Sequence, residues 1–220
     1  MEFRDLGEGR SIQRPSIDRE DLVPYTGPVK GELSLSMSSI DGTDATGALA
    51  EGIISRSVLD HVQLADAAVS SLHLTDAVLQ GADLSNGRWR NVYLSRVELA
   101  GCRGIGWQLT AAEARDVYAE DCRFDMAAID LEKVRGAVAF VRCSFKEASF
   151  SGLLDRVIFQ DCDLSGAEFA VVSARGCDLR DAELQGVRGM LSLRGARIRT
   201  AQVITAAEVL VTEAGLTVEP

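Results

Sequence analysis

The chain has 220 residues and a net charge of −10, with 46% hydrophobic but only 5% aromatic side chains. No stretch approaches the roughly 18 consecutive apolar residues of a membrane span, and the charged start MEFRDLGEGR lacks the apolar core of a secretory signal. We therefore expect a cytoplasmic protein without membrane contact. The five cysteines include no CxxC pair, and this pattern predicts neither a disulfide framework nor a zinc site.

The first 32 residues carry no repeat. They contain Pro15, Pro24 and Pro28 and the mixed-charge stretch IDREDLVPY. This composition predicts an irregular N-terminal segment. We expect it to cover the start of the repetitive region that follows, at residues 33–199.

The repetitive region has a period of five residues. In residues 77–102 the large apolar residue of each pentad, its central residue, is in turn Leu79, Leu84, Trp89, Leu94 and Leu99. A small or β-branched residue stands two places before each of them. A period of five fits neither the 3.6 of an α-helix nor the 2 of a strand. It indicates a chain that turns a corner every five residues and coils on itself.

The cysteines give a second, independent period. Cys102, Cys122, Cys143 and Cys162 are spaced by 20, 21 and 19 residues, and each stands two places before a central residue. We infer four pentads per coil, with these thiols stacked in one column inside the coils. Adjacent coils are then about 4.8 Å apart, the ordinary distance between paired strands.

Three residues depart from the repeat. Gly104 replaces a large central residue, whereas Trp107 and Glu132 occupy positions that should hold small inward side chains. We expect distorted coils there, with Trp107 filling the space left by Gly104. Between Val134 and Phe140 the register slips by one residue, which predicts a bulge.

These pentads, plain in CDLSGAEF (162–169) and CDLRDAEL (177–184), resemble the A(D/N)Lxx motif of the pentapeptide-repeat family over roughly residues 47–189. The resemblance implies an all-β fold, a right-handed parallel quadrilateral β-helix. The central residue and the residue two places before it point inward, and the other three point outward. Some members of the family bind DNA gyrase by resembling a duplex in width and negative surface.

The last segment, residues 200–220, is expected to be helical. Thr200 can cap the start of the helix and Gly215 can end it. An apolar stripe at helical spacing consists of Val203, Ile204, Ala207, Leu210 and Val211. The helix either caps the last coil or joins two copies into a homodimer, as the resemblance implies for some family members.

No arrangement of residues predicts catalysis. His61 and His73 are 12 residues apart on outward positions, and neither is placed beside a nucleophile. The inward thiols have no base at hand. The glycine-rich GCRGIGW lacks the Lys-Ser/Thr pair of a phosphate loop. We expect no catalytic residue, cofactor or metal.

The charges do not line up along the coils. Residues 47–199 hold 21 acids and 18 bases, so the ends of the chain carry most of the excess. Residues one coil apart alternate in sign and predict ion pairs between coils: Asp76 with Arg96, Glu113 with Lys133, Asp125 with Lys146, and Glu168 with Arg188. A DNA mimic would need acids stacked along the axis instead.

Two surfaces are candidates for a partner. The first is the acidic coil, residues 113–132, where Glu120, Asp121 and Asp130 lack a predicted partner on neighbouring coils, although a solvated belt explains them as well. The second is an outward apolar column interrupted by Glu98, with Ile53 and Tyr93 in a neighbouring column. The column contains Val58, Val78, Tyr118 and Ile158.

The sequence thus favours a non-enzymatic solenoid that acts as a protein-interaction module for an unknown protein partner. An alternative is a DNA-mimicking protein that binds a type II topoisomerase such as gyrase and confers drug resistance or regulates supercoiling. A third is an enzyme with an unrecognised surface site. None of the three hypotheses requires direct contact with nucleic acid.

Overall fold

The computed structural model describes residues 1–215. In most pentads of the repeat its backbone turns a corner two places after the central residue. Successive corners have φ angles of 51° at His61, 59° at Asp66, 50° at Ser71 and 51° at Asp76, followed by Gly81 at 59°. Left-handed backbone is tolerated best by glycine, asparagine and aspartate. The period of five is therefore the spacing of these corners, as predicted.

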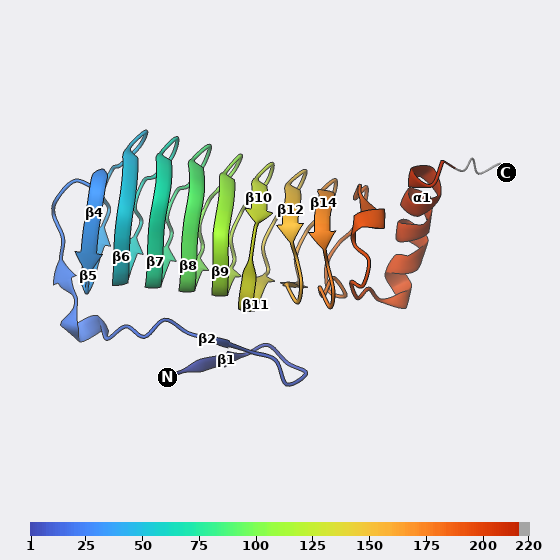
Figure 1. Ribbon diagram of the computed structural model, residues 1–220, viewed down its shortest axis with the longest axis horizontal. Helices are drawn as coiled ribbons and strands as arrows, with labels where there is room; N and C mark the ends of the chain where they lie inside the picture. The colour runs from blue at the N-terminus through green and yellow to red at the C-terminus, as the bar shows by residue number, and fades with distance from the viewer. Residues whose placement is uncertain (216–220) are drawn as a thin grey trace.

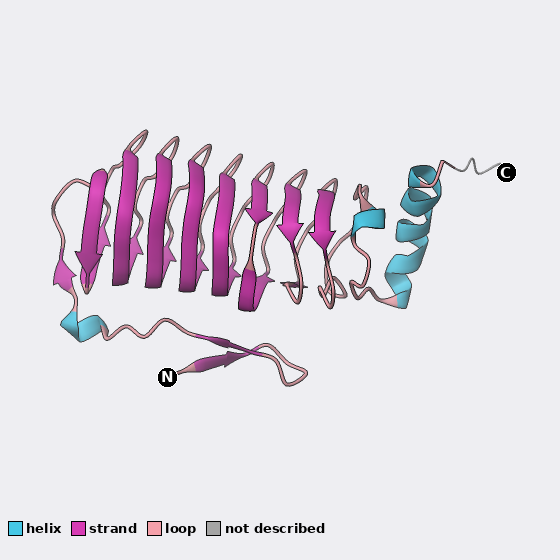
Figure 2. Ribbon diagram, viewed as in Figure 1, coloured by secondary structure: helices cyan, strands magenta, loops and turns pink. Residues whose placement is uncertain are grey.

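The corners divide the chain into short sides that stack as parallel strands (Figure 1). A β-strand hairpin and a short helical turn precede the stack, and helical turns and one α-helix follow it (Figure 2). The elements are β1 (Phe3–Asp5), β2 (Ser11–Gln13), η1 (Arg19–Asp21), β3 (Val23–Pro24), β4 (Gly31–Ser36), β5 (Ser38–Asp41), β6 (Leu49–Asp60), β7 (Ala68–Gln80), β8 (Arg88–Ala100), β9 (Gln108–Glu120), β10 (Ala128–Leu131), β11 (Val134–Val141), β12 (Ser149–Leu153), β13 (Ile158–Gln160), β14 (Glu168–Ser173), η2 (Met190–Ser192), η3 (Thr200–Gln202) and α1 (Val203–Glu213).

Four pentads make one coil, as predicted. Parallel bridges join the same position of successive coils at intervals of 19 to 21 residues, through Asp44, Gln63, Asp83, Arg103, Arg123, Ser144, Asp163 and Glu183. The four cysteines form the predicted inward column, each at most 3% exposed. The backbone N–H of Cys102 lies 3.3 Å from Cys122 Sγ on the next coil.

Aromatic rings run through the middle of the core. Six of them form an unbroken series of stacked, tilted or edge-to-face contacts with neighbouring centroids 5.1 to 5.6 Å apart, in the order Trp89, Trp107, Phe124, Phe145, Phe150 and Phe169. Trp107 is buried beside Gly104, as expected. Phe124 shares this space with Trp107, because a Cβ at Gly104 would lie 2.8 Å from the ring of Phe124 and 3.4 Å from Trp107 Cβ.

The predicted bulge lies between Arg135 and Val138, where the pairing of β11 with β9 shifts register. The same shift corrects another expectation. Glu132 does not occupy an inward position; it is exposed, and Leu131 enters the core with 2% of its surface accessible.

The predicted N-terminal segment, residues 1–32, covers the first coil only in part. Residues 1–22, which we call the arm, run along the outside of the solenoid toward its C-terminal coils (Figure 1). The closure of the first coil comes from the residues after the arm. Val23 and Pro24 pair with Ser38 and Ser39, and Val29 enters the core.

The α-helix α1 lies against the last coil. The carboxylate of Glu213 accepts hydrogen bonds from the backbone N–H groups of Gly189, Met190 and Leu191. Gln202 donates from Nε2 to two carbonyls of the preceding coil, and Ala206 is buried. The helical segment begins with η3 at Thr200, so its N-cap is Arg199. The prediction that Thr200 is the N-cap was wrong by one residue. Residues 216–220 of the predicted C-terminal segment lie outside the described residues.

None of the helices within residues 1–215 has the length and apolarity that crossing a membrane requires.

The aromatic core predicts a large effect of Phe145→Ala. Phe145 is fully buried and contacts four other phenylalanine rings. Its truncation leaves a cavity that neighbouring coils cannot fill, so the free energy of unfolding should fall by about 3–5 kcal/mol in chemical denaturation. Val172→Ala is the control, because Val172 is 81% exposed. A loss for Phe145→Ala no larger than that of the control contradicts the role of the aromatic stack.

Candidate functional site

The predicted apolar column exists and is longer than expected. Strand pairing places its members one above another on successive coils, from β6 to the coil after β13. We call this column the arm face, and it consists of Val58, Val78, Glu98, Tyr118, Ala139, Ile158 and Asp178. Three apolar residues therefore lie between two acids, and two more lie beyond Glu98.

The arm covers this column. Ile12, only 1% exposed, packs in one cluster with Tyr118, Ala139 and Ile158, and strand β2 contacts β9 and β11. The sequence analysis treated Tyr118, Ile158 and Val58 as surface residues. They point outward but are at most 6% exposed, because the N-terminal segment lies over this face. Val78 is half-buried.

The two acids of the arm face hold the arm by ion pairs. Glu98 accepts from Arg14 Nε at 3.0 Å and lies 3.5 Å from Arg4. Asp178, four coils away, accepts from Arg10 at 2.8 Å. The guanidinium of Arg4 also lies over the ring of Tyr118, 4.0 Å from its centroid. Glu98, the acid that interrupts the apolar column, thus anchors the arm.

The tip of the hairpin reaches the last coils. Glu8 pairs with Arg180 at 2.7 Å and with Arg197 at 3.0 Å. The hydrogen bonds from these two guanidiniums lower the pKa of Glu8 to about 2, and Arg180 makes the larger contribution. Burial by itself would raise the pKa of Asp178, but bonds from Arg180 and Arg10 outweigh it and hold that pKa well below its usual range. Burial raises the pKa of Tyr118 to about 12.

The arm is held at a few points rather than by a continuous core. Burying Ile12 contributes roughly 1.5–3 kcal/mol, and solvent-screened ion pairs add little each. Between residues 14 and 22, one hydrogen bond to a coil is present in the described structure, from the Ser16 N–H to Asp76. A two-stranded hairpin such as β1–β2 is at best marginally stable by itself.

The acidic coil is more fully paired than expected. Arg142 bonds Glu120 at 2.6 Å and Asp121 at 2.8 Å, so the prediction that these two acids lack a partner on a neighbouring coil was wrong. The 21-residue interval that separates Cys122 from Cys143 also places Arg142 over Asp121. Asp130 is half-buried and makes no ion pair within residues 1–215.

The predicted ion pairs between coils are confirmed in three cases of four. Asp76 pairs with Arg96 at 2.6 Å, Glu113 with Lys133 at 3.2 Å, and Glu168 with Arg188 at 3.2 Å.

The fourth predicted pair is wrong. Asp125 bonds Arg123 on its own coil at 2.6 Å and accepts from the backbone N–H of Lys146. The ammonium of Lys146 turns away to Asp163, at 3.1 Å.

Another apolar surface is left open. Ile53, His73 and Tyr93 pair along β6, β7 and β8, and the rings of His73 and Tyr93 stack 4.3 Å apart and parallel within 3°. Around the adjoining corner, small residues Ala68 and Ser70 leave a groove of about 560 Å³. We call this surface the corner patch, and it consists of Leu49, Ile53, His73, Arg88, Arg90 and Tyr93.

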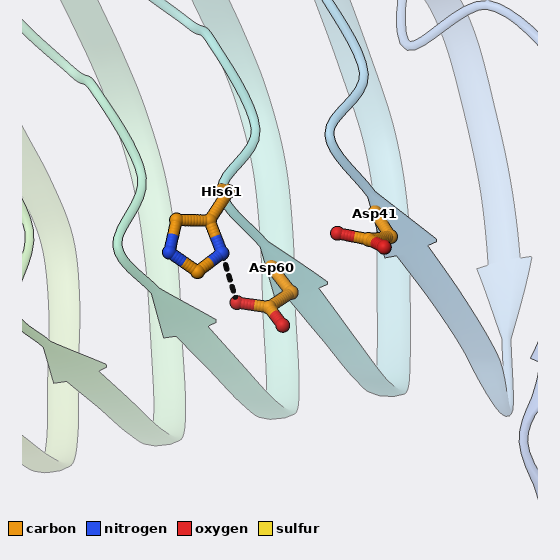
Figure 3. A group of neighbouring side chains, drawn as sticks. All are labelled: Asp41, Asp60 and His61. Carbon is orange, nitrogen blue, oxygen red and sulfur yellow. Dashed lines mark ion pairs between the residues drawn. The ribbon is translucent and has the colours of Figure 1, made fainter.

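One cluster has metal-binding donors. Figure 3 shows Asp41 and Asp60 on adjacent coils with His61 beside them; the donor atoms lie within 4.8 Å of one another. Two carboxylates and an imidazole could hold a divalent cation. However, the cluster is open to solvent, and His61 Nδ1 already lies 2.8 Å from Asp60.

Burial keeps the thiols from solvent, and it leaves one of them, Cys177, poorly suited to nucleophilic catalysis. All five cysteines are buried, and burial raises the pKa of Cys177 to about 12. A thiol in that state carries almost no thiolate at neutral pH.

The fold and its surfaces define a class: a parallel β-solenoid with flat, laddered outer faces. A family model for pentapeptide repeats matches eight copies, at residues 73–103 and 154–188. The same five-residue corners and 20-residue coils continue between and around these stretches. The chain thus carries pentapeptide repeats and folds as a pentapeptide-repeat solenoid.

Solved structures with a similar fold were also found. Full-length QnrB1, a plasmid-mediated fluoroquinolone resistance protein, is 16% identical, with 84% of this chain and 100% of that chain covered and a TM-score of 0.37. HetL from the cyanobacterium Nostoc sp. strain PCC 7120, involved in heterocyst differentiation regulation, is 16% identical, with 78% and 90% covered and a TM-score of 0.25. Scores this low support no argument about function. No curated protein matched the chain.

The ion pairs at the hairpin tip predict that arm docking weakens in acid. A carboxylate with a lowered pKa stabilises the docked state above its free pKa and loses that effect as pH falls through its docked pKa. For Glu8 this window runs from 4.5 to about 2. Hydrogen exchange of residues 6–14, corrected for intrinsic rates, should show protection falling across this window. In Glu8→Gln, part of this pH dependence should be missing. Unchanged protection throughout the window contradicts the prediction.

Proposed function

We propose that the protein is a non-enzymatic solenoid that binds a protein partner through the corner patch. The observation that carries the proposal is the exposed His73–Tyr93 stack beside Ile53, which is 53% exposed. Aromatic residues and arginine are enriched at the centres of protein interfaces. The rigid β-sheet beneath fixes these side chains, so little conformational entropy is lost when a partner binds.

The groove adds charged groups to this surface, the carboxylate of Glu51 and two guanidiniums. Arg88 and Arg90 flank it, both exposed, and neither makes an ion pair within the described residues. A guanidinium pairs well with carboxylates, often through two parallel hydrogen bonds. The chemistry therefore fits a partner segment that presents an apolar side chain beside an acidic one.

The surfaces expected from the sequence have less support as partner contacts. Val58, Tyr118 and Ile158 are covered by the arm. Glu120 and Asp121 share Arg142, which leaves Asp130 as the acid of that set without an ion pair in the described structure. These residues stay candidates only where the arm moves or where a partner competes for Arg142.

The topoisomerase alternative also has less support. A DNA mimic requires negative charge stacked along the axis, whereas Asp76, Glu113 and Glu168 are each neutralised by a base on the next coil. Protection of purified gyrase from a fluoroquinolone would bring this alternative back. A cytoplasmic location remains a prediction from the sequence.

Homodimerisation through α1 remains a second proposal, about assembly. Part of the apolar stripe faces outward: Val203 is 48% and Ile204 76% exposed, and Ala207 is exposed, whereas Leu210 and Val211 are half-buried. The stripe is therefore wider than the last coil covers.

If α1 joins two copies, Ile204→Asp should convert a dimer to a monomer, because it places a charge in an apolar contact. Light scattering after size exclusion measures the mass directly. Val172→Asp, at another exposed apolar site, should leave the dimer intact. A monomeric wild-type protein at micromolar concentration contradicts the proposal.

For the corner patch, the variant is Tyr93→Ser combined with Ile53→Ser. It should lose a partner that the wild type captures from a cell extract, with at least a tenfold weaker recovery, because both apolar contacts are removed. Val172→Ser is the matched control and should capture the partner as the wild type does. Equal recovery by all three proteins, measured by quantitative mass spectrometry, excludes the corner patch as the binding surface.

A further inference from the structure

The arm face has the pattern of a recognition site for an extended segment. Its acids, Glu98 and Asp178, are four coils apart, about 19 Å at the usual strand spacing. Between them, Tyr118, Ala139 and Ile158 form an apolar floor. Such a surface accepts an apolar side chain with a cation on either side.

The arm matches this pattern. Arg14 bonds Glu98, Ile12 lies on the floor, and Arg10 bonds Asp178. Successive side chains of a strand point to opposite faces, so residues 10, 12 and 14 of the extended segment share one face. The arm shows by its own contacts which chemistry the arm face binds.

The attachment is suited to exchange. Ile12 is the fully buried apolar residue of the arm, Leu6 is half-buried, and the ion pairs are partly exposed. Segments with few buried apolar contacts open locally without global unfolding. The coils beneath keep their own ladders and core when the arm leaves.

We propose that residues 1–22 are an exchangeable occupant of the arm face, and that this face binds an extended segment of a partner protein that carries an apolar residue between two cations. The partner segment takes the place of the arm. This inference deepens the proposed protein-binding function at a second surface. It does not use the corner patch, so a negative result for one surface leaves the proposal for the other surface unchanged.

A foreign segment fits this role better than the arm of a second copy. The chain's own arm is tethered to its site, which gives it a high effective concentration. An identical arm from another copy makes the same contacts without that advantage and loses the competition. A partner segment can win by filling the floor with a larger apolar side chain than Ile12.

The test uses the full chain and a fluorescent peptide with the sequence of residues 2–14, EFRDLGEGRSIQR. Ile12→Asp in the full chain should loosen the arm and free the face. The peptide should then bind this variant at least tenfold more tightly than the wild type, because the competing occupant is removed. The matched control Val172→Asp should bind the peptide as weakly as the wild type.

Two further measurements keep the result unambiguous. Hydrogen exchange must show faster exchange of residues 2–14 in Ile12→Asp, with the coils still protected; Arg10→Glu with Arg14→Glu is the second loosening variant. A peptide with Asp in place of Ile12 should not bind. The proposal is overturned if the peptide fails to bind a variant whose arm is loosened, or binds it no better than the wild type. It is also overturned if cross-links in a mixed-isotope sample join the arm of one copy to the face of another.

Discussion

The left-handed corner that ends most pentads is the constraint on which the rest of the molecule depends. Each corner ends one short side and starts the next, so that four sides close a coil and the next coil lies directly above. Residues one coil apart then form columns, inside as stacked thiols and aromatic rings, outside as ion pairs. The surfaces discussed above follow from this vertical alignment of side chains.

The alignment also explains why two apolar surfaces differ in what surrounds them. One column is bounded by acids and covered by the arm, and the corner patch is uncovered and flanked by unpaired arginines within the described residues. A single sequence thus presents one occupied and one open face on the same rigid body. Because the coils have little freedom to rearrange, a partner of the kind we propose would adapt to these faces rather than the reverse.

Much of this fold could be predicted because the repeat is local. The spacing of the cysteines predicts the coil length, and the slip near Val134 predicts the bulge. One error arose from a register shift of a single residue, because Leu131 takes the inward position that was predicted for Glu132. Another arose because the side chain of Lys146 can reach two acids, Asp125 and Asp163, and it pairs with the second. The pairing of Arg142 with Asp121 was open to prediction from the 21-residue interval.

The arm could not be predicted by the same means. Its residues carry no period, and their contacts lie far away in the sequence; Arg10 and Asp178 have a sequence separation of 168. Nothing in the local pattern of MEFRDLGEGRSIQR distinguishes a bound segment from a solvated one. The one sequence feature with a bearing on it was Glu98, an acid in an otherwise apolar column.

The reach of the arm has a consequence for how the molecule unfolds. A stack of repeats has contacts only between neighbours, so its ends fray separately and its middle can outlast both. Here residues that continue directly into the first coil also bond Arg180 and Arg197 near the last one. While the arm is docked, this brace links the two ends of the array, and once it has opened locally the coils unfold as an ordinary stack with contacts only between neighbours.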